Sequence, residues 1–130
     1  MVTITKTHIA RIYQNAIDVN NGIIHQQVAK INVIQSGMDS NSAGKYFVAI
    51  DAMFNGIHYG STINATATDY FWDNIRNDFG TDGLEKALRA LKSHIDYQEG
   101  RNHLPSLKKI YNRYMETLDI DFPELALYTL

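Results

Sequence analysis

The chain of 130 residues has no cysteine, only two prolines and no long run of apolar residues. Without cysteine it forms no disulfide, zinc–thiolate site or iron–sulfur cluster, and it offers no thiol nucleophile. No stretch approaches the roughly 18 consecutive apolar residues that cross a membrane. The N-terminal residues also lack the basic segment and apolar run of a signal peptide. We therefore expect a cytoplasmic protein without a membrane partner, a metal or another cofactor.

What the sequence does contain is typical of an ordinary globular protein. Apolar residues make up 45% of the chain and charged residues 20%, which is the usual balance. This length favours a single domain over residues 1–130 with a core of its own. The net charge of −2 conceals a segregation, because residues 66–85 are mainly acidic and residues 86–113 mainly basic. Such a distribution can orient a charged partner.

The N-terminal part predicts a helix followed by a strand. Apolar side chains first recur at intervals of three and four residues, as on one face of an amphipathic helix. These are Ile9, Ile12, Tyr13, Ala16 and Ile17. Asn-Asn-Gly at 20–22 should end this helix, because Asn and Gly accept the left-handed conformation. Over residues 23–35 the period changes to two, so Ala29, Ile31 and Val33 would point to one face of a first strand.

The next segments predict a loop and a hairpin. Residues 36–44 are small and polar, which favours a flexible loop. Asn55-Gly56 favours the positive φ angles of a two-residue type I′ turn, and so a hairpin of two further strands. Because side chains alternate along a strand, one face of this hairpin would belong to the core. That face would hold Tyr46, Val48, Ile50, Ala52 and Phe54.

Helices are expected after the hairpin. Thr66 and Asp69 have the spacing of a capping box, and Gly80 would end the helix that they begin. A leucine-rich stripe follows up to Gly100, and Pro105 suits the first turn of another helix. The predicted fold class is therefore α+β: an N-terminal helix, a three-stranded antiparallel sheet and two to three C-terminal helices.

Asp51 and His58 are weak catalytic candidates. They would be diagonal neighbours across the predicted hairpin, within reach of a hydrogen bond. A histidine oriented by an aspartate can act as a general base. No nucleophile is placed beside them by the sequence, so we interpret the pair as a cross-strand polar contact. The histidines lack the spacings of metal sites, and no glycine-rich phosphate loop is present.

An aromatic cluster at 70–72 supplies candidate binding residues. Three consecutive aromatic side chains span much of a helix circumference, so they cannot all face one core. Trp and Tyr dominate interface energetics, and Arg76 lies one turn beyond Trp72 on the same side. Basic residues of the next two helices would extend this surface toward phosphate groups. The candidate ligand- or partner-binding residues are Tyr70, Trp72, Arg76, Lys86, Arg89, Lys92, Arg101, Lys108, Lys109 and Arg113.

The element order and one loop resemble a family of phage inhibitors. A helix, three antiparallel strands and helices over residues 5–98 are similar to small anti-CRISPR proteins that inhibit type II-A systems. The loop Ser-Gly-Met-Asp-Ser-Asn-Ser at 36–42 carries the likeness in sequence. The resemblance implies a single-domain α+β protein of the phage anti-defence kind, which works by occupying a host component. It assigns no residue of this chain a functional role.

The leading hypothesis is a non-catalytic binding protein. It would be a phage or mobile-element inhibitor that sequesters a host defence protein or a small phosphorylated signal such as a nucleotide. One alternative is nucleic-acid binding through the basic C-terminal helices. The other is a small enzyme that uses Asp51 and His58. The apolar residues 125–130 need a groove in this chain or in a second copy, so the sequence is also compatible with a homo-oligomer.

Overall fold

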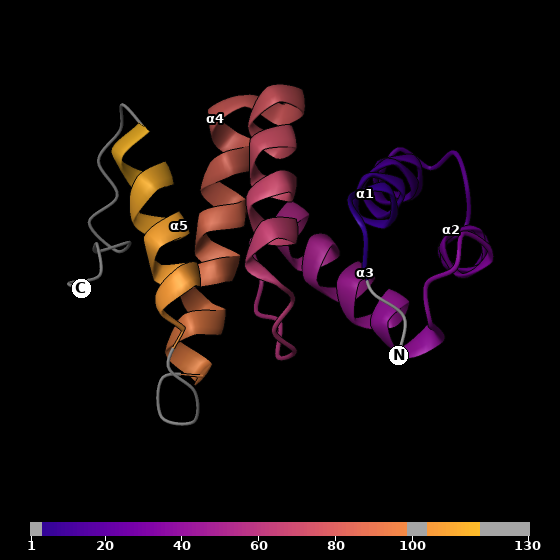
Figure 1. Cartoon of the computed structure of the whole chain (residues 1–130). Coiled ribbons are helices and arrows are strands. Elements are labelled where there is room, and N and C mark those ends of the chain that lie inside the picture. The colour runs from indigo at the N-terminus through magenta and orange to yellow at the C-terminus, as the bar shows by residue number, and fades with distance from the viewer. Residues whose placement is uncertain (1–3, 99–103, 118–130) are drawn as a thin grey trace. The chain divides into compact units, whose positions relative to one another are not determined.

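The computed structural model describes residues 4–98 and 104–117, and this part of the chain is built from helices (Figure 1). It contains five helices and no strand, so the predicted α+β class with a three-stranded sheet is wrong. The chain divides into two compact units, residues 1–51 and 52–130, called unit 1 and unit 2. Within the described ranges, no helix combines the length and the apolarity needed to cross a membrane.

Unit 1 begins with helix α1 (Lys6–Asn20), where the sequence predicts a helix. The Thr5 hydroxyl accepts a hydrogen bond from the backbone N–H of His8, and the His8 ring accepts one from the backbone N–H of Thr5. The two residues therefore cap the helix reciprocally. Gly22 follows the last turn with a φ of +74°, the angle expected after a helix end. The first predicted helix and its end are confirmed.

Helix α2 (Gln26–Gln35) replaces the predicted first strand. Ala29 and Val33 are fully buried, whereas Ile31 between them is 52% exposed. A strand would place all three side chains on one face, but a helix buries only the pair that is four residues apart. The apolar residues at 29, 31 and 33 have the spacing of a strand, and those at 29 and 33 also have the spacing of a helix. The burial pattern indicates the helix.

Helix α3 (Ser40–Asn55) replaces the predicted second strand and part of the predicted loop. Asp39 caps it, because its carboxylate accepts hydrogen bonds from the backbone N–H and the hydroxyl of Ser42. These bonds lower the pKa of Asp39. Val48 is expected on the core face of a strand, but its side chain is 55% exposed. The buried side chains follow a helical spacing instead: Ala43, Tyr46, Phe47, Ala49, Ile50, Ala52 and Met53.

The Asn55-Gly56 pair ends helix α3 and forms no hairpin. Gly56 has a φ of +68°, and the N–H of Ile57 bonds to the carbonyl oxygen of Ala52. Gly56 therefore has the positive φ expected from the sequence, whereas Asn55 does not. The hairpin prediction is wrong because the same angle closes a helix as readily as it turns two strands.

Unit 2 is dominated by helix α4 (Ala65–Gln98), which consists of two arms joined at Gly80. Gly80 adopts a φ of 71° and a ψ of −158°, a conformation that is essentially limited to glycine. The chain reverses there, so the first arm (65–79) and the second arm (81–98) lie side by side (Figure 1). Helix α5 (Pro105–Thr117) packs against α4.

The first arm of α4 is capped by Asn64 and not by the predicted Thr66. Oδ1 of Asn64 accepts a hydrogen bond from the backbone N–H of Ala67 at 2.7 Å. Asn64 is therefore the capping residue, and the capping box predicted for Thr66 and Asp69 is wrong. The Asp69 side chain is left to make contacts outside its own helix.

The core of unit 2 is formed by both arms of α4 and by α5. The arms approach closely near their turn, where a Cβ atom added to Gly83 would lie 2.4 Å from the Cβ of Phe79. The leucine stripe expected in the second arm is buried, and α5 adds the buried Leu107, Ile110, Tyr111 and Tyr114. The large apolar side chains of these helices with no exposed surface are Phe71, Trp72, Ile75, Leu84, Leu88, Leu91, Ile95 and Tyr111.

The loop between α3 and α4 is fastened to the second arm by its backbone and by some of its side chains. The carbonyl oxygen of Tyr59 lies 2.7 Å from Nδ1 of His94. The carbonyl oxygen of Gly60 accepts a hydrogen bond from the Gln98 amide at 2.9 Å. His94 and Gln98 are one turn apart and reach the loop from one side of the arm. The rings of Tyr59 and His94 stack with their centroids 4.4 Å apart.

The buried His94 leads to a prediction about stability and pH. Burial lowers its pKa below the ordinary 6.5, and the charge of His58 adds to this, while the hydrogen bond to Tyr59 opposes it. On acidification the unfolded chain therefore binds a proton before the folded chain does. We expect the free energy of unfolding to be largest above pH 6.5 and to fall as the pH drops toward the folded-state pKa.

Urea unfolding between about pH 5 and pH 7, where histidine titrates, measures this effect. The fluorescence of Trp72, the single tryptophan, reports on unit 2. His94→Gln should remove much of the slope, because an amide does not titrate. His25→Gln, at the exposed start of α2, is the matched control and should keep the slope. An unchanged slope in His94→Gln would contradict the prediction.

Candidate functional site

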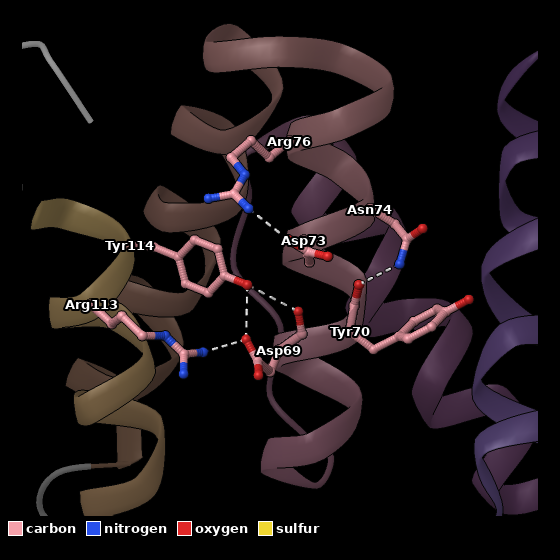
Figure 2. A network of polar contacts seen from close by, with 7 residues as sticks. All are labelled: Asp69, Tyr70, Asp73, Asn74, Arg76, Arg113 and Tyr114. Carbon is pink, nitrogen blue, oxygen red and sulfur yellow. Dashed lines mark hydrogen bonds and ion pairs between the residues drawn. The ribbon is translucent and has the colours of Figure 1, made fainter. Parts of the chain in front are cut away.

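A cleft of about 510 Å³ opens in unit 2 between the first arm of α4 and helix α5. Its volume falls within the range of about 300–1,000 Å³ that is typical of small-molecule sites. Figure 2 shows charged and aromatic side chains of both helices turned toward one another at this place. The lining residues are Thr66, Asp69, Tyr70, Asp73, Arg76, Arg113 and Tyr114.

Asp69 connects the two helices across the cleft. Its carboxylate forms an ion pair with the guanidinium of Arg113 and accepts a hydrogen bond from the Tyr114 hydroxyl at 2.8 Å. The same hydroxyl lies 3.2 Å from the backbone oxygen of Asp69. Because Asp69 belongs to α4 and its partners belong to α5, these contacts hold the walls of the cleft together.

Two guanidinium groups approach the ring of Tyr114. The Cζ atoms of Arg76 and Arg113 lie 5.6 and 5.2 Å from its centroid, within reach of cation–π attraction. Arg76 is also paired with Asp73, at 2.6 Å between Nη2 and Oδ1. The buried Trp72 meets the same ring edge-on, with centroids 5.0 Å apart. Both cations are therefore oriented by the protein itself.

The hydroxyl of Tyr114 is held in its protonated form. Burial raises its pKa well above the ordinary 10, and the hydrogen bond to Asp69 raises it further. The negative charges of Asp69 and Asp73 act in the same direction, while Arg113 opposes them. Tyr114 therefore acts as a fixed hydrogen-bond donor to Asp69 and not as a base.

Three of the binding residues predicted from the sequence line this cleft. They are Tyr70, Arg76 and Arg113. In Figure 2 the ring of Tyr70 points away from the ring of Tyr114, and its backbone oxygen accepts a hydrogen bond from Asn74. Trp72, predicted as an anchor for a partner, has no exposed surface. It does not reach a ligand, and it supports the Tyr114 ring from the core.

The predicted basic residues of the second arm of α4 do not line the cleft. Arg89 pairs with Glu85 at 2.7 Å, and Lys92 pairs with Asp96 at 2.9 Å. Lys86 is exposed. Two of these three cations are therefore neutralised by acids one turn away on their own helix.

The predicted residues at and beyond α5 are also dispersed. Lys108 is buried and Lys109 is exposed. Arg101 lies outside the described residues, as does the apolar segment 125–130. The structure brings Arg113 alone of the α5 cations into the cleft with Arg76.

The pairing predicted for Asp51 and His58 is wrong, because α3 and a loop replace the hairpin that would create it. Asp51 lies on the exposed side of α3. His58 follows that helix, with Nδ1 3.0 Å from the Ser93 hydroxyl and its ring edge-on to Tyr97. Neither residue lines the cleft.

Asp69, Asp73 and Tyr114 are site residues that the sequence reasoning missed. The pair of Asp73 and Arg76 has the spacing of neighbours on a helix, so that half of the network is readable from the sequence. The contact of Asp69 with Arg113 depends on how α5 packs and leaves no local pattern. In residues 4–98 and 104–117, no three His, Cys, Asp or Glu side chains gather as a metal site would require.

No family model matches this chain, and no curated protein or solved structure matches it either. A functional proposal therefore depends on the charges and the geometry of the cleft. Two properties matter most. The cleft has the volume of a small-ligand site, and it presents two guanidinium groups that are already held in place.

Proposed function

We propose that this chain is a non-catalytic binding protein of the anti-defence kind, which sequesters a small phosphorylated host signal in the α4–α5 cleft. The observation that carries the proposal is the convergence of Arg76 and Arg113, from different helices, on the Tyr114 ring. A guanidinium group presents a planar fork of donors that matches phosphate bidentately. A ligand with more than one phosphate group can engage both arginines.

The carboxylates that pair with these arginines do not exclude a phosphate. The side chains of Asp69, Asp73, Arg76 and Arg113 are 42% to 57% exposed. Exposed ion pairs contribute only about 0–1 kcal/mol. A phosphate group carries more charge than a carboxylate and offers three acceptor oxygens, so it can compete with an aspartate for a guanidinium group. Before binding, the aspartates keep the guanidinium groups oriented.

Isothermal titration calorimetry at low salt tests the proposal, with ATP, a cyclic dinucleotide and pyrophosphate as probes. Arg76→Gln and Arg113→Gln should each weaken binding about tenfold or more, because a charged hydrogen bond contributes about 1.5–3 kcal/mol. Lys86→Gln is the matched control, since it removes an exposed cation that does not line the cleft. Binding that is unaffected by both arginine substitutions, or no binding of any probe at about 1 mM, would refute the proposal.

Removing an aspartate tests whether it competes with the ligand for its arginine. Asp73→Asn keeps the size of the side chain but releases Arg76 from its ion pair. We expect the same probes to bind up to about fivefold more tightly to this variant, because the exposed pair no longer competes. Weaker binding would show that Asp73 does not compete with the ligand for Arg76, and the phosphate proposal would then be wrong.

A further inference from the structure

A second cleft, of about 310 Å³, lies in unit 1 between α1 and α2. Asn15 is only 8% exposed. Its amide nitrogen donates to the carbonyl oxygen of Arg11 at 2.8 Å, and its amide oxygen accepts from Asn32 at 3.0 Å. The lining contains a cation, three amides and a hydroxyl but no carboxylate: Arg11, Asn15, Asn32, Gln35 and Ser36.

This cleft presents groups that no described residue engages. Within residues 4–98 and 104–117, the Arg11 guanidinium has no ion pair and the Gln35 amide has no hydrogen-bond partner. The other arginines of this part of the chain each contact a carboxylate. No acid stands three or four positions from Arg11 in the sequence. Uncompensated positive charge beside amide donors is suited to a carboxylate or another oxyanion.

Two exposed apolar side chains continue this surface along α2. Val28 is 46% exposed and Ile31 is 52% exposed. They precede Asn32 and Gln35 by four residues each, so the four side chains form neighbouring positions on one side of the helix. A free oxyanion would gain no binding energy from contact with these apolar side chains. A polypeptide does, because apolar surface rimmed by polar groups is typical of protein interaction sites.

We infer that the α1–α2 cleft and the strip of Val28 and Ile31 together dock an acidic segment of a partner polypeptide. A carboxylate of that segment pairs with Arg11 and accepts hydrogen bonds from the amides of Asn32 and Gln35. A neighbouring apolar side chain of the segment covers the strip. The uncompensated charge of Arg11 decides for an acidic partner over a basic one. This inference does not rest on the phosphate proposal, because the two sites lie in different units.

NMR of the ¹⁵N-labelled full chain tests the inference through the side-chain amide signals of Asn32 and Gln35. The probe is acetyl-Glu-Leu-Leu-amide, and acetyl-Gln-Leu-Leu-amide is the uncharged comparison. We expect saturable shifts with the first peptide and about tenfold weaker binding of the second, since a charged hydrogen bond is lost. Arg11→Gln should weaken the acidic peptide about tenfold, and the double variant Val28→Ala and Ile31→Ala should also weaken it. Lys6→Gln, an exposed cation of α1 outside the cleft, should leave it unchanged.

Several outcomes would overturn this inference. Equal binding of the two peptides, or full binding to Arg11→Gln, would remove the role of charge. An unchanged affinity of the acidic peptide for the double alanine variant would show that the strip does not contribute to binding. Inorganic phosphate that shifts the same signals as strongly as the acidic peptide would indicate a free-oxyanion site. Absence of a saturable shift up to about 10 mM peptide would show that the surface does not dock such a segment.

Discussion

Replacing Trp72 with alanine is expected to lower the free energy of unfolding by about 3–5 kcal/mol. The indole has no exposed surface and is among the largest fully buried side chains of the described residues. It also meets the Tyr114 ring edge-on, so its removal would leave a cavity behind a wall of the cleft. Urea unfolding followed by far-ultraviolet circular dichroism measures the loss, because the variant has no tryptophan fluorescence.

A conservative variant at the same position separates packing from polarity. Nε1 of Trp72 is buried without a hydrogen-bond partner in the described part of the chain. Trp72→Phe keeps an aromatic ring and removes this unsatisfied N–H group, so we expect a clearly smaller loss than for alanine. If alanine at position 72 left the stability unchanged while weakening ligand binding, Trp72 would be an exposed anchor after all.

Gly80→Ala is expected to lower the free energy of unfolding by about 1–3 kcal/mol, because φ 71° with ψ −158° is strained for any residue with a Cβ. Both arms are helical up to this point, and alanine is the best helix former. The variant therefore also favours a straight helix through position 80. A straightened α4 could not fold back on itself, and its arms would pair with those of a second copy.

Urea unfolding monitored by Trp72 fluorescence measures the loss of stability at Gly80, and light scattering after refolding at high concentration measures dimer formation. Gly60→Ala is the matched control, because Gly60 has no positive φ and a Cβ added there meets no atom within 4 Å. It should change stability by no more than about 0.5 kcal/mol. A Gly80→Ala protein that is as stable as the parent and monomeric would show that the turn does not depend on glycine.

The sequence predicts those helices well whose apolar residues have only one possible period. Helix α1, the leucine stripe of α4 and the start of α5 at Pro105 all appear where expected. Residues 23–54 are apolar at so many positions that alternate and helical spacings are both present. Ile31 and Val48 decide between the two, because each is exposed, and exposure is a tertiary property. The predicted fold class is wrong because the sequence does not reveal that these two side chains are exposed. It is also wrong because Asn55-Gly56 can either end a helix or turn a hairpin.

The sequence predicts the contacts of the candidate site that lie within one helix, but not those between helices. Arg76 and Asp73 are neighbours on one helix, so their pairing can be read from their spacing. The link between Asp69 and Arg113 spans 44 residues and exists only because α5 packs against the first arm of α4. The burial of Trp72 depends on the same packing. No local pattern carries that information.

The attachment of the loop before α4 determines where substitutions in this region are tolerated. The main-chain oxygens of Tyr59 and Gly60 supply part of its hold, and every amino acid possesses such an oxygen. The matching donors are specific side chains, those of His94 and Gln98. The side chains of His58, Tyr59 and Thr62 supply the rest. Loops usually accept more variation than the elements they join. Here we expect substitutions at Gly60 and Ser61 to be tolerated, while the regular helix opposite them carries the stricter evolutionary constraint.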